Sequence, residues 1–211
     1  MSTTTEGDRA RLLEAMLEEL VDKGYREAEV AGAIERAHLT AGDWSPLFAD
    51  KDACLIAAFE QLADQLRGAI CDGCAGGGDW PGHVAGGLRA LLATLAARAP
   101  MAEALARGIP SISPAAQVRY QAFVEGLAPL LAEGREFARL GPELPGEVEL
   151  LAVGAAEAII FAQIQEGRTA ELPALGPEIL FSVLVPFLGP ALAAAQMEKE
   201  RAGEGTELEP A

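Results

Sequence analysis

Apolar residues recur at helical spacing along most of this 211-residue chain. Between Asp8 and Lys23 they are Leu12, Leu13, Met16, Leu17, Leu20 and Val21. This is the i, i+4, i+8 pattern of one helical face. Ala and Leu supply most of the apolar residues and both favour helices, whereas long alternating runs of Val, Ile, Thr and Tyr are missing. The pattern therefore predicts an all-α protein and argues against a β-sandwich or barrel.

Glycine and proline divide the chain into further helical segments. The pattern predicts helices over residues 27–37, 41–47, 51–70, 81–97, 101–107, 114–133, 147–166 and 177–196. Gly24 is placed to end the first helix, and Pro46 is expected to shorten or distort the helix over 41–47. Thr40 is a good N-cap for that helix, with Asp43 three residues later as a weak capping box. Asp50 is placed to cap the helix that follows.

The first 50 residues carry a more specific signal. Short helices joined by a tight turn near residue 38 are typical of a helix-turn-helix unit. The characteristic residues are Arg11-Leu12-Leu13-Glu14-Ala15, Gly24-Tyr25, Val30, Ala33, Ile34, Ala37, Leu39, Thr40, Gly42, Trp44, Phe48 and Lys51. This set resembles the tetracycline-repressor-like (TetR/AcrR) family of bacterial transcription regulators. The resemblance implies a helix-turn-helix domain over residues 1–49 and a ligand-binding and dimerisation domain over 50–195. Residues 196–211 are expected to form a disordered acidic tail.

The resemblance also implies a double-stranded DNA operator as partner. The residues expected at that interface are Thr40, Ala41, Asp43, Trp44, Ser45 and Lys51. Alternative roles fit the same residues: Trp44 can pack a small core, Thr40 and Asp43 can cap a helix, and Lys51 can be a solvated surface charge.

Several departures from the family pattern weaken the DNA interpretation. His38 replaces the turn glycine, where the backbone often needs a positive φ. Ser45 stands where the family has a phosphate-contacting Tyr, and residues 41–47 contain no Arg or Lys. Residues 1–60 hold six basic and thirteen acidic residues, a net charge of −7, and the whole chain carries −16. We expect DNA binding that is weaker and more salt-sensitive than usual, or absent.

The rest of the chain agrees with the ligand and dimer roles that the resemblance implies. A pocket for an apolar or weakly polar small molecule is expected among Trp80, His83, Met101, Arg119, Tyr120 and Phe123. A homodimer interface is expected along two helical stripes, which contain Leu151, Ala155, Ile159, Ala162, Leu180, Leu184 and Phe187. Both sets of side chains could instead belong to the core of the protomer.

Other function classes find little support. The two histidines are far apart, and no Gly-x-Ser-x-Gly, Gly-x-Gly-x-x-Gly or phosphate-loop motif occurs, so we expect no enzyme and no cofactor. Cys71 and Cys74 form a single CxxC motif. This motif could form a zinc site with His83 and Asp79, or it could act as a redox switch. A plain structural role at the end of a helix is favoured over both, and no metal is expected. The polar N-terminus, the absence of 18 consecutive apolar residues and the three cysteines predict a cytoplasmic protein without a membrane span.

The resulting hypothesis is a ligand-responsive regulator. A small molecule would stabilise a dimer whose recognition helices are wrongly spaced for successive major grooves, and the repressor would leave its operator. The alternative is a dimeric scaffold of the same fold that has lost ordinary operator binding and acts as a ligand-binding or protein-interaction module.

Overall fold

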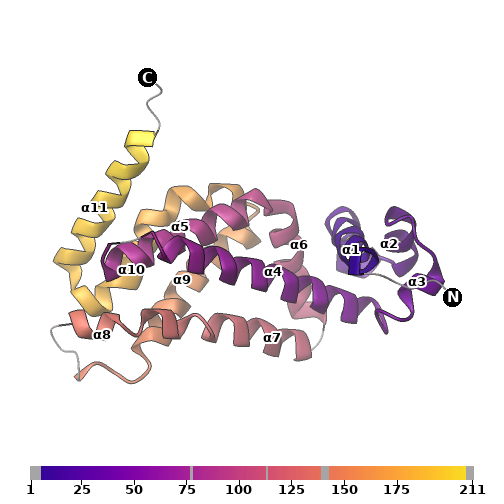
Figure 1. The fold of residues 1–211 in the computed structure, drawn as a ribbon, viewed down its shortest axis with the longest axis horizontal. Coiled ribbons are helices and arrows are strands. Elements are labelled where there is room, and N and C mark those ends of the chain that lie inside the picture. The colour runs from indigo at the N-terminus through magenta and orange to yellow at the C-terminus, as the bar shows by residue number, and fades with distance from the viewer. Residues whose placement is uncertain (1–5, 77, 113, 139–142, 208–211) are drawn as a thin grey trace. The chain divides into compact units, whose positions relative to one another are not determined.

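The computed structural model describes residues 6–76, 78–112, 114–138 and 143–207, and these residues form helices and no strands. In chain order the elements are α1 (Glu6–Glu27), α2 (Val30–Arg36), α3 (Ala41–Trp44), α4 (Lys51–Cys74), α5 (Trp80–Ala97), α6 (Ala99–Ile112), α7 (Pro114–Glu125), the 3-10 turn η1 (Ala128–Leu131), α8 (Gly134–Phe137), α9 (Val148–Gln165), the 3-10 turn η3 (Thr169–Leu175), α10 (Gly176–Leu188) and α11 (Pro190–Glu207) (Figure 1). The predicted all-α class is confirmed.

The local stop and start signals act as the sequence predicts. Gly24 has φ 76° and ψ 167°, so the backbone leaves the helical conformation there even though α1 continues to Glu27. The carboxylate of Asp50 accepts a hydrogen bond from the backbone N–H of Ala53 at 2.8 Å, which caps the start of α4. The regular helix α3 ends at Trp44, two residues before Pro46.

The chain divides into two compact units. The first comprises Met1–Gln65 and Arg98–Tyr120, and in it α6 packs against α1. Its core contains Leu12, Leu13, Met16, Leu20, Leu55 and Leu105, each at most 2% exposed. The unit therefore reaches beyond the boundary that we expected after residue 49, because the apolar face of α1 is covered by a helix from later in the chain.

The second unit comprises Leu66–Ala97 and Gln121–Ala211. Helix α10 packs against α5, α8, α9 and α11 in this unit. Trp80 from α5 lies at its core, with its ring 5.2 Å from that of Phe187 and 5.6 Å from that of Phe137. A Cβ atom added at Gly134 would come within 2.4 Å of the Trp80 ring, so the indole packs directly on the backbone of α8.

The C-terminal part of the chain differs from the prediction. The helix expected over 177–196 is divided at Gly189, whose φ of 75° ends α10, and Pro190 then opens α11. Residues 196–207 belong to α11, so the expectation of disorder from residue 196 is wrong for them; residues 208–211 lie outside the described part. Two charged residues of this segment pair with residues of other helices: Arg201 with Glu178 at 2.6 Å and Glu200 with Arg89 at 2.6 Å.

Two segments, Val148–Gln165 and Thr169–Leu188, are long and apolar enough in composition to cross a membrane. The second is not one regular helix, because it runs through η3 and contains Pro173. Both segments pack against each other and against neighbouring helices of the second unit. Core helices of a globular protein pass the same test, so composition alone is weak evidence for a membrane span.

Candidate functional site

The turn between α2 and α3 has the geometry of a helix-turn-helix corner. His38 has φ 55°, the only positive φ of a non-glycine residue in the described part of the chain. The backbone N–H groups of His38 and Leu39 donate to the carbonyl oxygens of Glu35 and Ile34, both at 3.1 Å, and so close the end of α2. The expectation that position 38 needs a positive φ is confirmed, and His tolerates that conformation better than a β-branched residue would.

The first turn of α3 is closed by Asp43. Its carboxylate accepts hydrogen bonds from the backbone N–H of Thr40 at 2.9 Å and from the Thr40 hydroxyl at 2.7 Å. The Thr40 hydroxyl and backbone N–H hold the pKa of Asp43 below its usual value. Asp43 is 8% exposed. Its carboxylate is thus engaged in the capping box at the start of α3.

Five of the six residues expected at the DNA interface fall into two groups. Thr40, Ala41 and Ser45 are exposed, whereas Asp43 and Trp44 are buried. The Trp44 ring lies 5.2 Å from the Phe48 ring, so it packs a small core of the first unit. The side chain of Trp44 is therefore part of the core of the first unit, whereas Thr40, Ala41 and Ser45 lie at its surface.

Lys51 is engaged within the first unit. Its ammonium donates hydrogen bonds to the backbone carbonyls of Tyr25 at 2.7 Å and Ala28 at 3.1 Å, and it lies 4.5 Å from the centre of the Tyr25 ring. These contacts join the start of α4 to the end of α1 and to the link that follows it. The Tyr25 hydroxyl adds a hydrogen bond to Asp52 at 2.9 Å.

A buried carboxylate joins α1 to α2. The Glu19 side chain is 1% exposed and accepts hydrogen bonds from Lys23 and from Arg36 Nε, the latter at 2.9 Å. The Lys23 ammonium, together with Arg36, holds the pKa of Glu19 below its usual value against the effect of burial. Arg36 also pairs with Asp22 at 2.6 Å.

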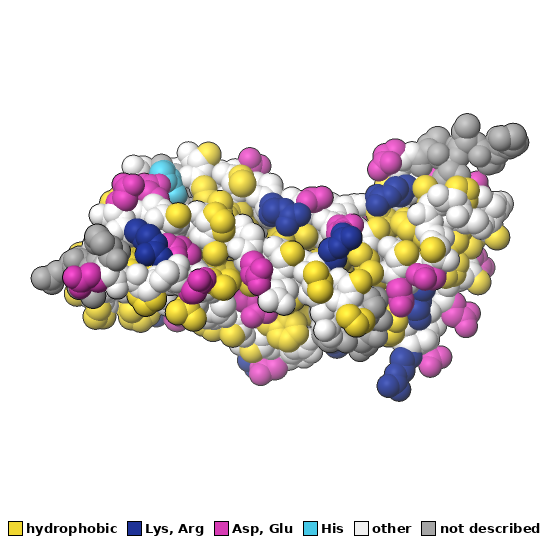
Figure 2. Space-filling view, turned by 90° about the horizontal axis from the view of Figure 1, so that it is seen from below, with side chains coloured by type: hydrophobic (Ala, Val, Ile, Leu, Met, Phe, Trp, Pro, Cys, Tyr) yellow, Lys and Arg dark blue, Asp and Glu magenta, His cyan; other side chains and the backbone are white. Residues whose placement is uncertain are grey.

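Arg9 and Arg11, both on α1, also have partners within the first unit. Arg11 pairs with Asp8 and reaches the carbonyl of Ala37 at 3.5 Å, and Arg9 lies over the Phe48 ring at 5.8 Å. Among the six basic residues of positions 1–60, these two, Lys23, Arg36 and Lys51 all have internal partners. On the face drawn in Figure 2, the described Lys and Arg side chains are dispersed among Asp and Glu. Residues 1–60 therefore offer few basic groups for phosphate without rearrangement.

The stripe expected for dimerisation on α9 is exposed. Leu151 is 64% exposed, Ala155 and Ala162 are exposed, and Ile159 is half-buried. By contrast Leu180, Leu184 and Phe187 on α10 are at most 2% exposed. They cannot contact a partner as expected, because they face α5 and the core of their own unit. Periodicity marked the apolar face of α10 correctly but could not show which surface covers it.

Several solved structures of regulators have a similar arrangement of helices. A fatty acid degradation regulator, FadR, from Bacillus halodurans is similar with a TM-score of 0.74 and 18% identity, covering 84% of this chain and 94% of that one. A TetR family transcription regulator from Marinobacter aquaeolei VT8 has a TM-score of 0.61 and 18% identity, over 92% and 95% of the two chains. A transcriptional regulator from Rhodococcus sp. Rha1 has a TM-score of 0.53 and 20% identity, over 94% and 97%.

The chain has a TetR-like fold. No protein-family model and no curated protein matches the sequence. At 18–20% identity the likeness establishes the fold, and the resemblance seen in the first 50 residues is confirmed at that level.

The residues expected to line a ligand pocket are divided between the two units of the TetR-like fold. Met101, Arg119 and Tyr120 belong to the first unit and Trp80, His83 and Phe123 to the second. In the first unit Arg119 pairs with Glu60, and the Tyr120 ring lies 6.1 Å from that of Phe59.

In the second unit Trp80 is 2% exposed, and its indole Nε1 has no hydrogen-bond partner among the described residues. The Phe123 ring lies under Arg67 at 5.5 Å. The role of the six as a pocket stays a prediction.

The cysteines of the TetR-like fold lie in different environments. Cys71 is exposed, Cys74 is half-buried, and Cys54 is buried. Burial raises the pKa of the Cys54 thiol to about 12 and also raises that of Cys74. The described residues contain no group of three or more His, Cys, Asp or Glu side chains that could hold a metal ion.

Sequence reasoning missed the part played by Glu19. It lies three residues after Met16 on the apolar face of the first helix, where a charged residue breaks the pattern. A carboxylate at such a position is buried and must be paired, and this signal could have pointed to a cationic partner on the next helix.

Proposed function

We propose that this chain is a DNA-binding transcription regulator that acts as a homodimer in the cytoplasm, most simply a repressor that a small molecule releases from its operator. The observation that carries the proposal is the α2–α3 corner, with His38 at φ 55°, in a chain of TetR-like fold. In this arrangement the exposed start of α3 is the part that enters a major groove.

The proposed contacts to DNA are few and mainly uncharged. Thr40 and Ala41 lie at the exposed start of α3, and Ser45 follows its last residue. The Thr40 and Ser45 hydroxyl groups donate to Asp43 and to the Ala41 carbonyl, so toward DNA they offer acceptor oxygens, and Ala41 offers a methyl group. Because five nearby basic side chains have internal partners, few phosphate contacts add to the affinity. The affinity should therefore be modest, and binding should depend on contacts to bases and on the backbone N–H groups of α3.

Fluorescence anisotropy with the DNA upstream of the chain's own gene tests this function. A scrambled duplex of equal length is the control, and both are measured at low and near-physiological salt. Selective binding that persists at near-physiological salt supports the regulator, and Ser45→Ala should then weaken it. Equal binding of both duplexes, or none at either salt, contradicts regulation of that operator.

The proposed dimer uses the exposed face of α9. Leu151, Ala155 and Ala162 lie on one side of the helix, and their small or apolar side chains allow close approach of a second copy. Leu151→Glu should convert the dimer to monomer in light scattering after gel filtration. Val118→Glu on α7 is a matched control, because both side chains are 64% exposed. Equal behaviour of the two variants would exclude the α9 face.

A second function is favoured by the internal engagement of the basic side chains. A TetR-like dimer that has lost ordinary operator binding would act as a ligand-binding or protein-interaction module. The charge of −7 over residues 1–60 and the capping role of Asp43 support it. Absence of selective DNA binding, together with a dimer in light scattering, would favour this function over the first.

A further inference from the structure

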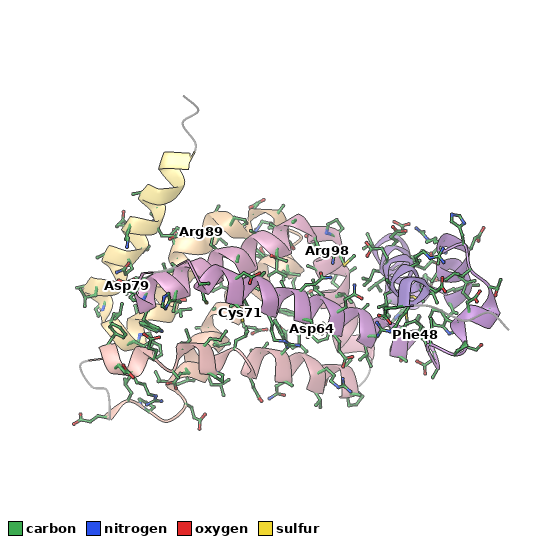
Figure 3. The ribbon with its side chains drawn as sticks, in the orientation of Figure 1. Phe48, Asp64, Cys71, Asp79, Arg89 and Arg98 are labelled. Atoms are coloured by element: carbon green, nitrogen blue, oxygen red, sulfur yellow. The ribbon has the colours of Figure 1, made fainter. Side chains whose placement is uncertain are left out.

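The two cysteines of the CxxC motif lie in the last turn of α4, which ends at Cys74. Cys71 is exposed and is marked in Figure 3, whereas Cys74 is half-buried. Two long backbone hydrogen bonds close this end of the helix. The N–H of Ala75 donates to the Cys71 carbonyl at 3.3 Å, and that of Gly76 donates to the Gly73 carbonyl at 3.4 Å. A loosely closed helix end with two glycines allows small shifts of the backbone.

The inner side of this turn packs directly on α5. A Cβ atom added to Gly73 would collide with the carbonyl oxygen of Gly86, and one added to Gly86 would collide with that of Gly73. A Cβ atom added to Gly87 would lie 2.7 Å from the Sγ atom of Cys74. The thiol of Cys74 is therefore held against the backbone of α5, whereas that of Cys71 is open to solvent.

The spacing of the two cysteines is close to that of a disulfide. Residues three positions apart in a helix have Cα atoms about 5 Å apart, a distance that a disulfide accepts. Their Cβ atoms are about 5–6 Å apart, whereas a disulfide needs about 3.5–4.5 Å, so the last turn must tighten by about 1 Å. Because Gly73 lies against Gly86 without a gap, tightening strains this contact, and a strained disulfide is readily reduced.

We propose that Cys71 and Cys74 are a redox modification site, at which a small disulfide such as glutathione disulfide forms a reversible bond between them. The Cys71 thiolate attacks one sulfur of the reagent, forms a mixed disulfide and releases a glutathione thiolate, which takes the proton of Cys74. The Cys74 thiolate then attacks the Cys71 Sγ atom and releases the second glutathione, which takes from water the proton that Cys71 gave up. The two cysteines lose two electrons, and the reagent is reduced to two glutathione molecules.

The order of these two attacks follows from the surroundings of the thiols. Burial, and after it the nearby Cys71, raises the pKa of Cys74, although the Gly87 N–H opposes this shift. Cys74 is therefore the protonated second thiol, and the exposed Cys71 meets the reagent first. Cys54 is buried, and its pKa of about 12 keeps it out of the reaction. The site lies within the second unit and does not rest on the proposed DNA binding.

Intact-mass spectrometry of the full chain in glutathione redox buffers tests the proposal. The oxidised chain should lose two hydrogen atoms, and peptide mapping should place the bond between Cys71 and Cys74. Raising reduced glutathione about ten-fold at constant glutathione disulfide should lower the ratio of disulfide to dithiol about a hundred-fold, because two thiols are released for each bond formed. A mixed disulfide would fall only about ten-fold, because its formation releases one thiol. Dithiothreitol should restore the reduced mass.

Cys74→Ser should stop at the mixed disulfide on Cys71. Cys54→Ala is the matched control and should behave as the unaltered chain, because it keeps both cysteines of the motif. Circular dichroism before each titration establishes that the variants are folded. A lasting mixed disulfide on Cys71 of the unaltered chain, a disulfide between two chains or one that includes Cys54 would overturn the proposal. So would the absence of oxidation at millimolar glutathione disulfide.

Discussion

Replacing Gly134 with alanine should destabilise the second unit. A Cβ atom there would lie 2.4 Å from Cζ2 of Trp80 and 2.9 Å from Cδ1 of Phe187, whereas ordinary contacts begin at 3.4 Å. The Trp80 ring would have to move by about 1 Å, but it is only 2% exposed and both rings are rigid. Overpacking of this kind costs about 1–3 kcal/mol.

A matched substitution separates packing from helix propensity. Gly68 lies in α4, and an added Cβ would meet nothing within 4 Å. Gly68→Ala should therefore raise the free energy of unfolding by about 1 kcal/mol, the difference in helix propensity between the two residues. Urea denaturation followed by far-UV circular dichroism measures both variants. The reasoning is refuted if Gly134→Ala is as stable as Gly68→Ala, because the close packing of Trp80 on α8 would then be wrong.

Three further predictions follow from single side chains. Lys51→Met should lower the free energy of unfolding by about 1–3 kcal/mol in thermal or urea denaturation, because two backbone carbonyls lose a charged donor. A loss of DNA affinity without any loss of stability would instead indicate that Lys51 contacts phosphate. The pKa of Glu19 is lowered in the folded state, so its ionised form contributes to stability above about pH 4.5, and this contribution is lost as the pH falls through the folded-state pKa. Acidification from about pH 5 to pH 3 should therefore lower the free energy of unfolding less in Glu19→Gln than in the unaltered chain. Parallel pH profiles of the two proteins in urea denaturation would contradict this. Iodoacetamide at pH about 8 should modify Cys71 before Cys54, whose thiol is buried and has a pKa raised to about 12. Equal rates of alkylation of the two cysteines in peptide mass spectrometry would show that Cys54 is accessible.

Local signals in the sequence were sufficient for much of the helical framework. Gly24 and Asp50 act through the backbone groups nearest to them, so their effect does not depend on distant parts of the chain. His38 could be expected to have a positive φ because it replaces the turn glycine of the family pattern that the first 50 residues resemble. The helix over residues 177–196 was not divided correctly, although Gly189 and Pro190 form the same kind of signal.

Features that depend on distant partners could not be predicted in the same way. The segment after residue 196 reads as a charged tail because its apolar periodicity is weak. It continues as a helix where Glu200 and Arg201 meet Arg89 and Glu178, residues far from them in sequence. Each such pair contributes little to stability in water. Because its two members are far apart in sequence, no local pattern predicts it.

The candidate DNA interface shows the same limit more sharply. The family resemblance places Lys51 and Asp43 at the DNA interface. In the structure Lys51 donates to two backbone carbonyls, and Asp43 caps a helix. A basic residue can be counted from the sequence, whereas its availability depends on which acceptors the fold places beside it. The charge that matters for a polyanion is therefore the charge left unpaired after folding. Over residues 1–60 internal pairing makes it smaller than the six basic residues there suggest.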